Sequence, residues 1–419
     1  MAMNMVQKIM AQASGRDSVE PGEIVIANVD TDILHDLSGY ITSNVYEKEV
    51  KLPMRYPERI VMVFDHHFSP PSLERADVLE HTREFCRKYG INLLDCGSGN
   101  IHHAAVWGGY IRPGMVVAGS DSHTPVHGTL GCLSVGLGNN CHAAMVMPYG
   151  KAWLRVPEAY KINLTGTQKD GVVPRDAALW LAGQIGEGGA VYKALEFDGP
   201  FLRDLDVWDR WLFPLLTIDA GAKCGYIDPD QKTIDFVAHV TNHPFQVVHS
   251  DPDCSYQEVR DYDISHLEPQ VAASPTIGNV KAVGQFAGNK IQWAELGGHG
   301  GGRIEDIRQA ARILGGRHIA PGVKFNVVPS SRQVFSQAID EGLVGSLFDA
   351  GCTWFPPSTG SNQAINMGAM SATEAMVSTH ARNFPGRNGS PKAIMYLSSA
   401  YTVAASALNG CITDPRDYL

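Results

Sequence analysis

Three short segments in the first third of the chain combine aspartate and histidine at spacings that allow acid–base chemistry. They are Asp65-His66-His67, His102-His103 and Asp121-Ser122-His123. A carboxylate beside an imidazole orients the ring and tunes its affinity for a proton, which suits a general acid or base. The plainer alternative is that each polar residue caps a helix or satisfies a turn. Three such segments together favour one shared site, and its candidate catalytic residues are Asp65, His66, His102, Asp121 and His123.

Short apolar runs and longer helical patterns alternate around these segments. The runs cover residues 59–64 and 115–118, and each is followed by one of the aspartate-bearing segments. Residues 72–89 carry an apolar stripe that starts at a serine and stops at Gly90, which predicts a helix. This alternation predicts an α/β protein with buried parallel strands. Ligands bind at the carboxyl ends of strands in such sheets, so the Asp and His side chains are expected to share a cleft.

The length of 419 residues indicates two or three domains, because a single hydrophobic core stops growing near about 250 to 300 residues. A strand-like segment at residues 160–164 and an aspartate-rich stretch at residues 251–263 mark the expected boundaries. The predicted domains are residues 1–156, 157–272 and 273–419, which all fall in the usual size range.

The net charge is −10 and no lysine- or arginine-rich run occurs. Binding to nucleic acid or to an anionic membrane surface is therefore not expected. The apolar stretches fall short of the roughly 20 residues that cross a bilayer, and no export signal opens the chain. The expected location is the cytoplasm.

Longer stretches around these residues resemble the aconitase and isopropylmalate dehydratase family of hydro-lyases. The stretch GSDSHTPVHGTLGCLSVGLG (119–138) is similar to the family's DSHT element, VMVFDHHFSP (61–70) to its Asp-His element, and His102 lies at the matching distance before IRPGM (111–115). Towards the end, LEPQVAASP (267–275) resembles the opening of the third domain and ARNFPGRNG (381–389) the RNFxGR motif. The resemblance covers essentially the whole chain.

This resemblance implies three α/β/α domains around a common cleft, with the family's fourth, swivelling domain absent from this chain. It implies a hydro-lyase or isomerase that acts on a small hydroxy carboxylic acid, together with a small swivel-domain subunit. It also assigns substrate-binding roles to His35, Ser122, Asp219, His299, Arg382 and Arg387. The two arginines suit carboxylate anchors because a guanidinium pairs with a carboxylate in a bidentate manner. An interdomain salt bridge is the alternative for Arg387.

The chain departs from the family where the iron–sulfur cluster is bound. His299 in GHGGGRIEDIR (298–308) stands at the first cluster cysteine, and Thr359 and Asn362 in WFPPSTGSNQAIN (354–366) stand at the other two. Such clusters are held by cysteine thiolates, and neither a hydroxyl nor an amide is a soft ligand. The eight cysteines include no Cys-x-x-Cys pair, and the nearby Cys352 alone cannot replace three thiolates. We therefore predict that the 4Fe-4S cluster is absent.

Two kinds of catalysis remain open without the cluster. A single divalent metal could be held by His299 together with some of His66, His102, His123 and Asp121, and act as a Lewis acid. Alternatively, the loop at residues 297–302 (GGHGGG) could offer backbone N–H groups to a carboxylate or oxyanion. The lack of a His-x-x-x-His pair on one helix favours metal-free catalysis or a loosely bound metal.

Two alternative functions compete with the hydro-lyase hypothesis. One is a non-catalytic, carboxylate-binding regulatory protein that lost turnover with the cluster. The other is a different reaction centred on His299, because function resides in the site and not in the fold. A decaying site would lose its acid–base residues as readily as its cysteines, yet only the cysteines are gone. The enzyme hypothesis therefore leads.

Overall fold

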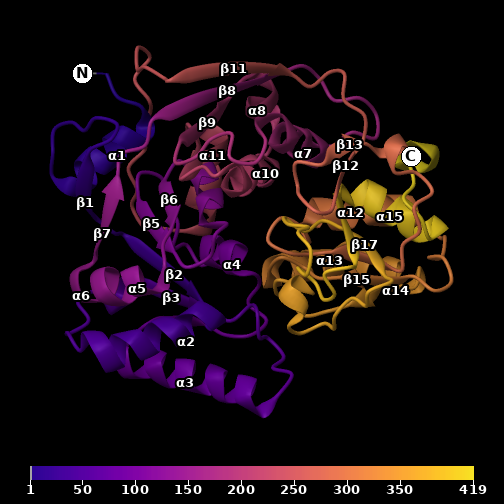
Figure 1. The fold of residues 1–419 in the computed structure, drawn as a ribbon, viewed down its shortest axis with the longest axis horizontal. Helices are drawn as coiled ribbons and strands as arrows, with labels where there is room; N and C mark the ends of the chain where they lie inside the picture. The colour runs from indigo at the N-terminus through magenta and orange to yellow at the C-terminus, as the bar shows by residue number, and fades with distance from the viewer. Residues whose placement is uncertain (1) are drawn as a thin grey trace.

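The first of three large β-sheets carries the acid–base segments, and a two-stranded ribbon forms a fourth sheet. A computed structural model describes residues 2–419, and Figure 1 shows its sheets covered by helices. The first sheet has five parallel strands in the order β4-β3-β2-β5-β6. Their bounds are β2 (Thr31–His35), β3 (Ile60–Val63), β4 (Asn92–Leu94), β5 (Val116–Gly119) and β6 (Leu133–Gly136). Strands β3 and β5 are buried at every position, which explains their continuous apolar sequence.

Helices α2 (Asp36–Val45), α3 (Leu73–Tyr89) and α4 (Ile101–Trp107) accompany the first sheet. The prediction of a helix over residues 72–89 is confirmed by α3. Ser72 accepts a hydrogen bond from the backbone N–H of Arg75, and Gly90 ends the helix in the left-handed region with φ +74°. Helix α4 starts after Asn100, so His102 lies in its first turn.

The second sheet follows in the chain and is also parallel, in the order β10-β9-β8-β11. Its strands are β8 (Ala159–Thr165), β9 (Ala194–Asp198), β10 (Cys224–Ile227) and β11 (Glu258–Asp263). Its helices are α7 (Pro174–Ile185), α8 (Pro200–Asp204), α9 (Val207–Arg210), α10 (Leu212–Leu215) and α11 (Gln231–Val240).

The third sheet has seven strands in the order β13-β12-β18-β17-β14-β15-β16. They are β12 (Gln270–Ala273), β13 (Val280–Ala282), β14 (Trp293–Leu296), β15 (Lys324–Val327), β16 (Thr353–Trp354), β17 (Ala375–Ser378) and β18 (Ile394–Ser398). Helices α12 (Ile304–Leu314), α13 (Arg332–Asp340), α14 (Leu343–Asp349) and α15 (Ala400–Asn409) cover it. Strand β12 spans the predicted boundary after residue 272 and pairs with β13 and β18. The α/β fold class is confirmed, and the division into residues 1–156, 157–272 and 273–419 stays a prediction.

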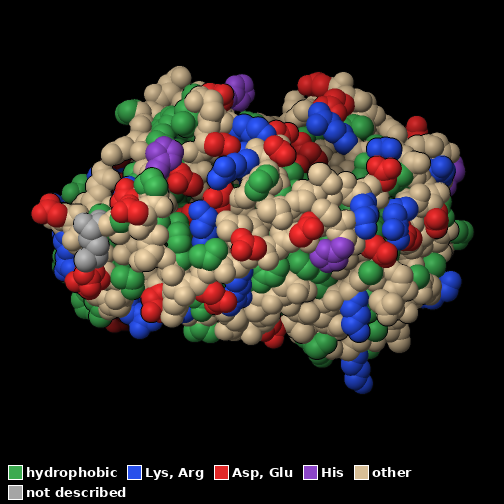
Figure 2. All heavy atoms as spheres, turned by 90° about the horizontal axis from the view of Figure 1, so that it is seen from above, with side chains coloured by type: hydrophobic (Ala, Val, Ile, Leu, Met, Phe, Trp, Pro, Cys, Tyr) green, Lys and Arg blue, Asp and Glu red, His purple; other side chains and the backbone are tan. Residues whose placement is uncertain are grey.

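Shorter elements complete the amino-terminal part. Helix α1 (Met5–Ser14) packs beside an antiparallel ribbon of β1 (Ile24–Asn28) and β7 (Lys151–Arg155), and α5 (Asn139–Cys141) and α6 (Met147–Tyr149) are single turns. Among residues 2–419, no helix combines the length and apolar character that a membrane span requires. Acidic and basic side chains are interspersed over the face shown in Figure 2.

Buried contacts join the three sheets. One continuous apolar core includes Ile33 from the first sheet, Leu195 from the second and Ala272 from the third. Arg175 at the start of α7 is 2 % exposed and donates to the carbonyls of Ser398 (2.8 Å) and Gly300 (2.9 Å), as well as to that of His380. This one guanidinium therefore fixes the loop that carries His299 to the second sheet.

Candidate active site

The acid–base segments follow the carboxyl ends of three neighbouring strands. His35 ends β2, Asp65 comes two residues after β3, and Asp121 comes two residues after β5. Because these strands are parallel and adjacent, their ends meet at one edge of the sheet. Two groups of potential ligand atoms result, each with all its atoms within 4.8 Å of one another: His102, Asp121, His123 and His299, and His35, Asp36, Asp65 and His66. Neither group contains a cysteine.

Asp65 orients His66 in the second group. Its Oδ1 lies 2.7 Å from His66 Nδ1, and its Oδ2 accepts the N–H of Ile101 at the start of α4. Burial alone would lower the pKa of His66, but the carboxylates of Asp65 and Asp36 outweigh it and raise that pKa to about 9. His66 is therefore an imidazolium at neutral pH. Its Nε2 has no hydrogen-bond partner within residues 2–419, so this N–H is available to a ligand.

His35 is the neutral neighbour of His66. The two rings stack with centroids 4.3 Å apart. Burial, followed by the charge on His66, lowers the pKa of His35 to about 4. The pair thus combines a protonated and a neutral imidazole at one edge of the sheet. His66 is suited to act as an acid, and His35 is suited to orient it.

Asp121 is the centre of the first group. Its Oδ1 lies 3.1 Å from His102 Nε2 and 3.1 Å from His123 Nδ1, and it also accepts the backbone N–H of His123 at 2.7 Å. Burial opposes ionisation, but His299 and the hydrogen bonds from His102 and His123 hold the pKa of Asp121 well below its usual range. Asp121 is therefore a buried carboxylate surrounded by imidazoles.

His299 enters this group from the loop between β14 and α12. Its Nδ1 lies 3.0 Å from His123 Nδ1 and 3.8 Å from Asp121 Oδ1, and its side chain is 2 % exposed. Burial lowers the pKa of His299 well below its ordinary value. The structure thus joins His299 to Asp121 and His123.

The glycines beside His299 serve close packing. A β-carbon at Gly301 would overlap the Thr379 hydroxyl, and Gly302 has φ +72° and lies against the carbonyl of Val328. The Gly297 N–H already donates to Thr379 Oγ1. The glycine-rich sequence is therefore explained by the close approach of neighbouring backbone, independently of any oxyanion.

Thr359 and Asn362 lie in a loop that packs against the Asp65 segment. The Thr359 hydroxyl and backbone N–H both donate to the carbonyl of Asp65, at 3.1 and 3.3 Å. Asn362 is buried, and its Nδ2 has no partner within residues 2–419. At the two cluster-cysteine positions the chain therefore offers a hydroxyl that is already hydrogen-bonded, from Thr359, and an amide, from Asn362.

Arg382, in the part of the chain that forms the third sheet, contacts residues from the parts that form the first and second sheets. Its Nη1 donates to Ser122 Oγ at 2.9 Å, and its Nε donates to Asp219 Oδ1 at 3.0 Å. Arg387 makes no ion pair with a carboxylate in the described part of the chain, so the structure does not show the interdomain salt bridge considered for it. Burial, followed by the charge of Arg382, lowers the pKa of Arg387 to about 10. Binding of an anion beside Arg387 would offset both effects.

Two residues at this site, Asp36 and Lys223, are not among those predicted from the sequence. Asp36 follows a strand end directly after His35 and accepts the N–H groups of both His66 and His67, so the signal that identified Asp65 applied to it equally. Lys223 lines a cavity of about 250 Å³ together with Ser120, Asp121 and Ser122. Burial lowers the pKa of Lys223. No local pattern pointed to Lys223, because only the fold brings it beside Asp121.

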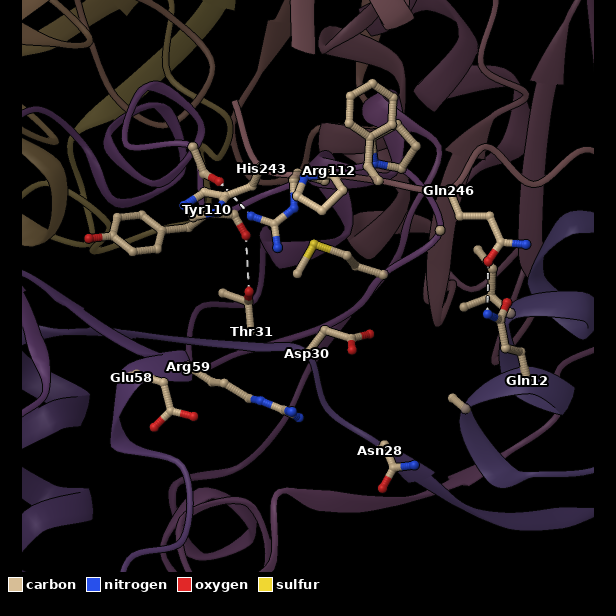
Figure 3. A pocket seen from close by; sticks show the side chains of 18 of the residues that line it. Gln12, Asn28, Asp30, Thr31, Glu58, Arg59, Tyr110, Arg112, His243 and Gln246 are labelled. Atoms are coloured by element: carbon tan, nitrogen blue, oxygen red, sulfur yellow. Dashed lines mark hydrogen bonds between the residues drawn. The ribbon is translucent and has the colours of Figure 1, made fainter. Parts of the chain in front are cut away.

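A larger cavity lies at the opposite end of the same sheet. It has a volume of about 780 Å³ and is lined by Asp30 and Thr31 at the start of β2, Arg59 before β3, and Arg112 before β5 (Figure 3). These residues lie at the amino-terminal ends of β2, β3 and β5, whereas His35, Asp65 and Asp121 lie at or just after the carboxyl ends of the same strands. The cavity is therefore separate from the acid–base site.

The chain is similar to known proteins in sequence and in fold. The model of the "Aconitase family (aconitate hydratase)" matches residues 8–295 and 275–410. A probable 3-isopropylmalate dehydratase large subunit of Methanothermobacter thermautotrophicus is 39% identical over 99% of both chains, and a 3-isopropylmalate dehydratase large subunit of Methanopyrus kandleri is 39% identical over 100% of both. A probable methanogen homoaconitase large subunit of M. thermautotrophicus is 38% identical over 99% of this chain and 98% of its own length.

A solved structure agrees at the level of the fold. Thermococcus kodakaraensis aconitase X in its holo form covers 90% of this chain with a TM-score of 0.52 at 11% identity, and 89% of that chain is matched. The family match and the relatives named 3-isopropylmalate dehydratase identify an α/β enzyme of the hydro-lyase kind. The chain belongs to the aconitase family, which confirms the resemblance seen in its sequence.

Proposed function

We propose that this chain is the large subunit of a hydro-lyase or isomerase that acts on a small hydroxy carboxylic acid without a 4Fe-4S cluster. The observation that carries the proposal is the contact between Arg382 and Ser122, at 2.9 Å. It places a guanidinium that can bind a substrate carboxylate next to Asp121 and its two imidazoles. The relatives at 38–39% identity, named for isopropylmalate dehydratase and homoaconitase, support the same substrate class.

The residues divide the reaction between binding and proton transfer. Arg382 and Arg387 bind carboxylate groups of the substrate. His66, protonated and held by Asp65, gives its Nε2 proton to the departing hydroxyl, which leaves as water. A base removes the proton beside a carboxylate, and that C–H electron pair becomes the new double bond. Addition of water to the other carbon of the double bond would complete an isomerisation.

The family's iron–sulfur cluster does not fit the residues present. A cubane needs thiolates, whereas the three positions hold His299, the hydrogen-bonded Thr359 and Asn362. Cys352 cannot supply a thiolate, since it is part of the core of the third sheet and burial raises its pKa to about 12. We therefore assign no step to a cluster.

A small swivel-domain subunit completes the proposal. The relatives are named large subunits, and we assign the base that starts the elimination to the small subunit. A cytoplasmic complex is in keeping with the eight cysteines, all of which are free thiols.

The test uses the full chain purified without oxygen together with the small subunit encoded beside it. Formation of an unsaturated acid from a panel of 2-hydroxy and 3-hydroxy di- and tricarboxylic acids is followed by ultraviolet absorbance, with iron and sulfide measured on the same sample. We expect turnover that is lost in His66→Asn and kept in His318→Asn, which changes an exposed histidine. Ligand binding without turnover would support the regulatory alternative instead, and stoichiometric iron with sulfide would contradict the cluster-free site.

A further inference from the structure

We infer that His102, Asp121, His123 and His299 form a binding site for one transition-metal ion of the zinc, cobalt or ferrous type. This inference rests on the proposed function and deepens it, because it names the group that takes the cluster's place. The four residues come from α4, from the segment after β5 and from the loop after β14. All four are buried, and their ligand atoms lie within 4.8 Å of one another.

The spacing of the atoms matches a tetrahedral metal site. Metal–nitrogen and metal–oxygen bonds of about 2.0 to 2.1 Å at tetrahedral angles put neighbouring ligand atoms about 3.3 to 3.4 Å apart. The separations here are 3.1 Å for His102 Nε2 to Asp121 Oδ1, 3.1 Å for His123 Nδ1 to the same oxygen, 3.0 Å for His123 Nδ1 to His299 Nδ1, and 3.8 Å for His299 Nδ1 to Asp121 Oδ1. These four values lie on both sides of the ideal separation, and the ligand atoms of the whole group stay within 4.8 Å of one another.

Hydrogen bonding alone leaves this arrangement unsatisfied. His123 Nδ1 carries at most one hydrogen, yet it lies near both Asp121 Oδ1 and His299 Nδ1. If that hydrogen points to Asp121, the contact between the two ring nitrogens lacks a proper hydrogen bond. If His299 donates to His123, two lone pairs face each other between His123 and Asp121. A cation among the lone pairs satisfies all of these contacts together.

The neighbouring group of His35, Asp36, Asp65 and His66 does not share this property. Both oxygens of Asp36 accept backbone N–H groups, from His66 and His67, and those of Asp65 are occupied by His66 Nδ1 and the Ile101 N–H. Its carboxylates are therefore used for orientation. The metal site is confined to the group that contains His299.

Position 299 is also held firmly enough for a ligand. Arg175 donates to the carbonyl of Gly300, and the adjoining glycines pack against Thr379 and Val328. Three imidazoles and one carboxylate favour borderline transition metals over Mg²⁺ or Ca²⁺, which prefer all-oxygen sites. The four ligands come from separate elements, so no single short motif contains them.

The experiment titrates the chelator-treated full chain with Co²⁺ in the absence of substrate. We expect one Co²⁺ per chain and the intense visible absorption typical of tetrahedral cobalt. His299→Ala and Asp121→Asn should weaken binding more than about 100-fold, since even groups behind the ligands are worth about 10- to 100-fold. His66→Ala, from the neighbouring group, is the matched control and should bind Co²⁺ like the wild type.

His299→Cys keeps a ligand at the position and should add a thiolate-to-cobalt charge-transfer band. Absence of that band, failure to bind one equivalent, or unchanged binding in a folded His299→Ala, checked by circular dichroism, would overturn the inference. Because no substrate is present, metal binding without turnover would leave the site standing and count against the proposed function alone. Turnover that survives complete metal removal would overturn the assignment of this ion to the cluster's place and would leave the proposed function standing.

Discussion

The Thr359 hydroxyl donates a hydrogen bond to the backbone carbonyl of Asp65 across 294 positions of sequence. The resemblance places a cluster cysteine at this position. The contact ties the loop at residues 354–366 directly to the segment that orients His66. A direct hydrogen bond thus connects two parts of the cleft.

We predict that Thr359→Val lowers kcat but reduces the free energy of unfolding only slightly. The Thr359 N–H still reaches Asp65, so the lost hydroxyl should reduce the free energy of unfolding by about 1 kcal/mol. Denaturant unfolding and kcat are compared with those of Thr353→Val, an exposed position. Equal kcat in Thr359→Val and wild type would show that the contact does not position Asp65.

Arg175→Met should destabilise the protein by more than about 3 kcal/mol, because it leaves buried carbonyls of Gly300, His380 and Ser398 without their donor. The control is Arg308→Met, which removes an exposed ion pair with Glu341 and should cost no more than about 1 kcal/mol. Both values come from urea unfolding. A similar small loss in the two variants would refute the anchoring role of Arg175.

Arg382→Lys should lower kcat/KM by about 100-fold. A lysine cannot reproduce the bidentate fork, and the loss of about 3 kcal/mol from a charged hydrogen bond corresponds to that factor. Steady-state kinetics are compared with those of Arg416→Lys, at an exposed arginine paired with Asp414. Equal kcat/KM in both variants would remove Arg382 from the carboxylate site.

The buried pair of His142 and Asp32 predicts a pH dependence of stability. Burial would lower the pKa of His142, but Asp32, 2.7 Å away, outweighs it and raises the pKa above 6.5. A raised folded-state pKa contributes stability that is complete below the unfolded pKa of about 6.5 and is lost as the pH rises through the folded value.

The free energy of unfolding of wild type should therefore fall above pH 6.5 relative to that of the double variant Asp32→Asn with His142→Gln. Denaturant unfolding at a series of pH values measures the difference. Parallel curves for the two proteins would contradict the prediction.

Local sequence was enough to find strands β3, β5 and β8, helix α3 and the acid–base segments. Strand β3 has a continuous apolar sequence, and helix α3 has an apolar stripe that begins at a serine cap. Both are patterns among neighbouring residues. Asp65 and Asp121 were found because each follows such a strand, and polar residues at strand ends are typical of α/β sites. His299, Thr359 and Asn362 were found by their positions in motifs.

What the sequence by itself determined is the fold class, the family resemblance and the membership of most of the site. Only the tertiary structure decided that His299 meets His123 across 176 positions, that Arg382 reaches both Ser122 and Asp219, and that Lys223 borders Asp121. Periodicity and capping are set by interactions among residues a few positions apart. These side chains instead meet because the three sheets pack together. A pattern among neighbouring residues does not specify which distant residues come into contact.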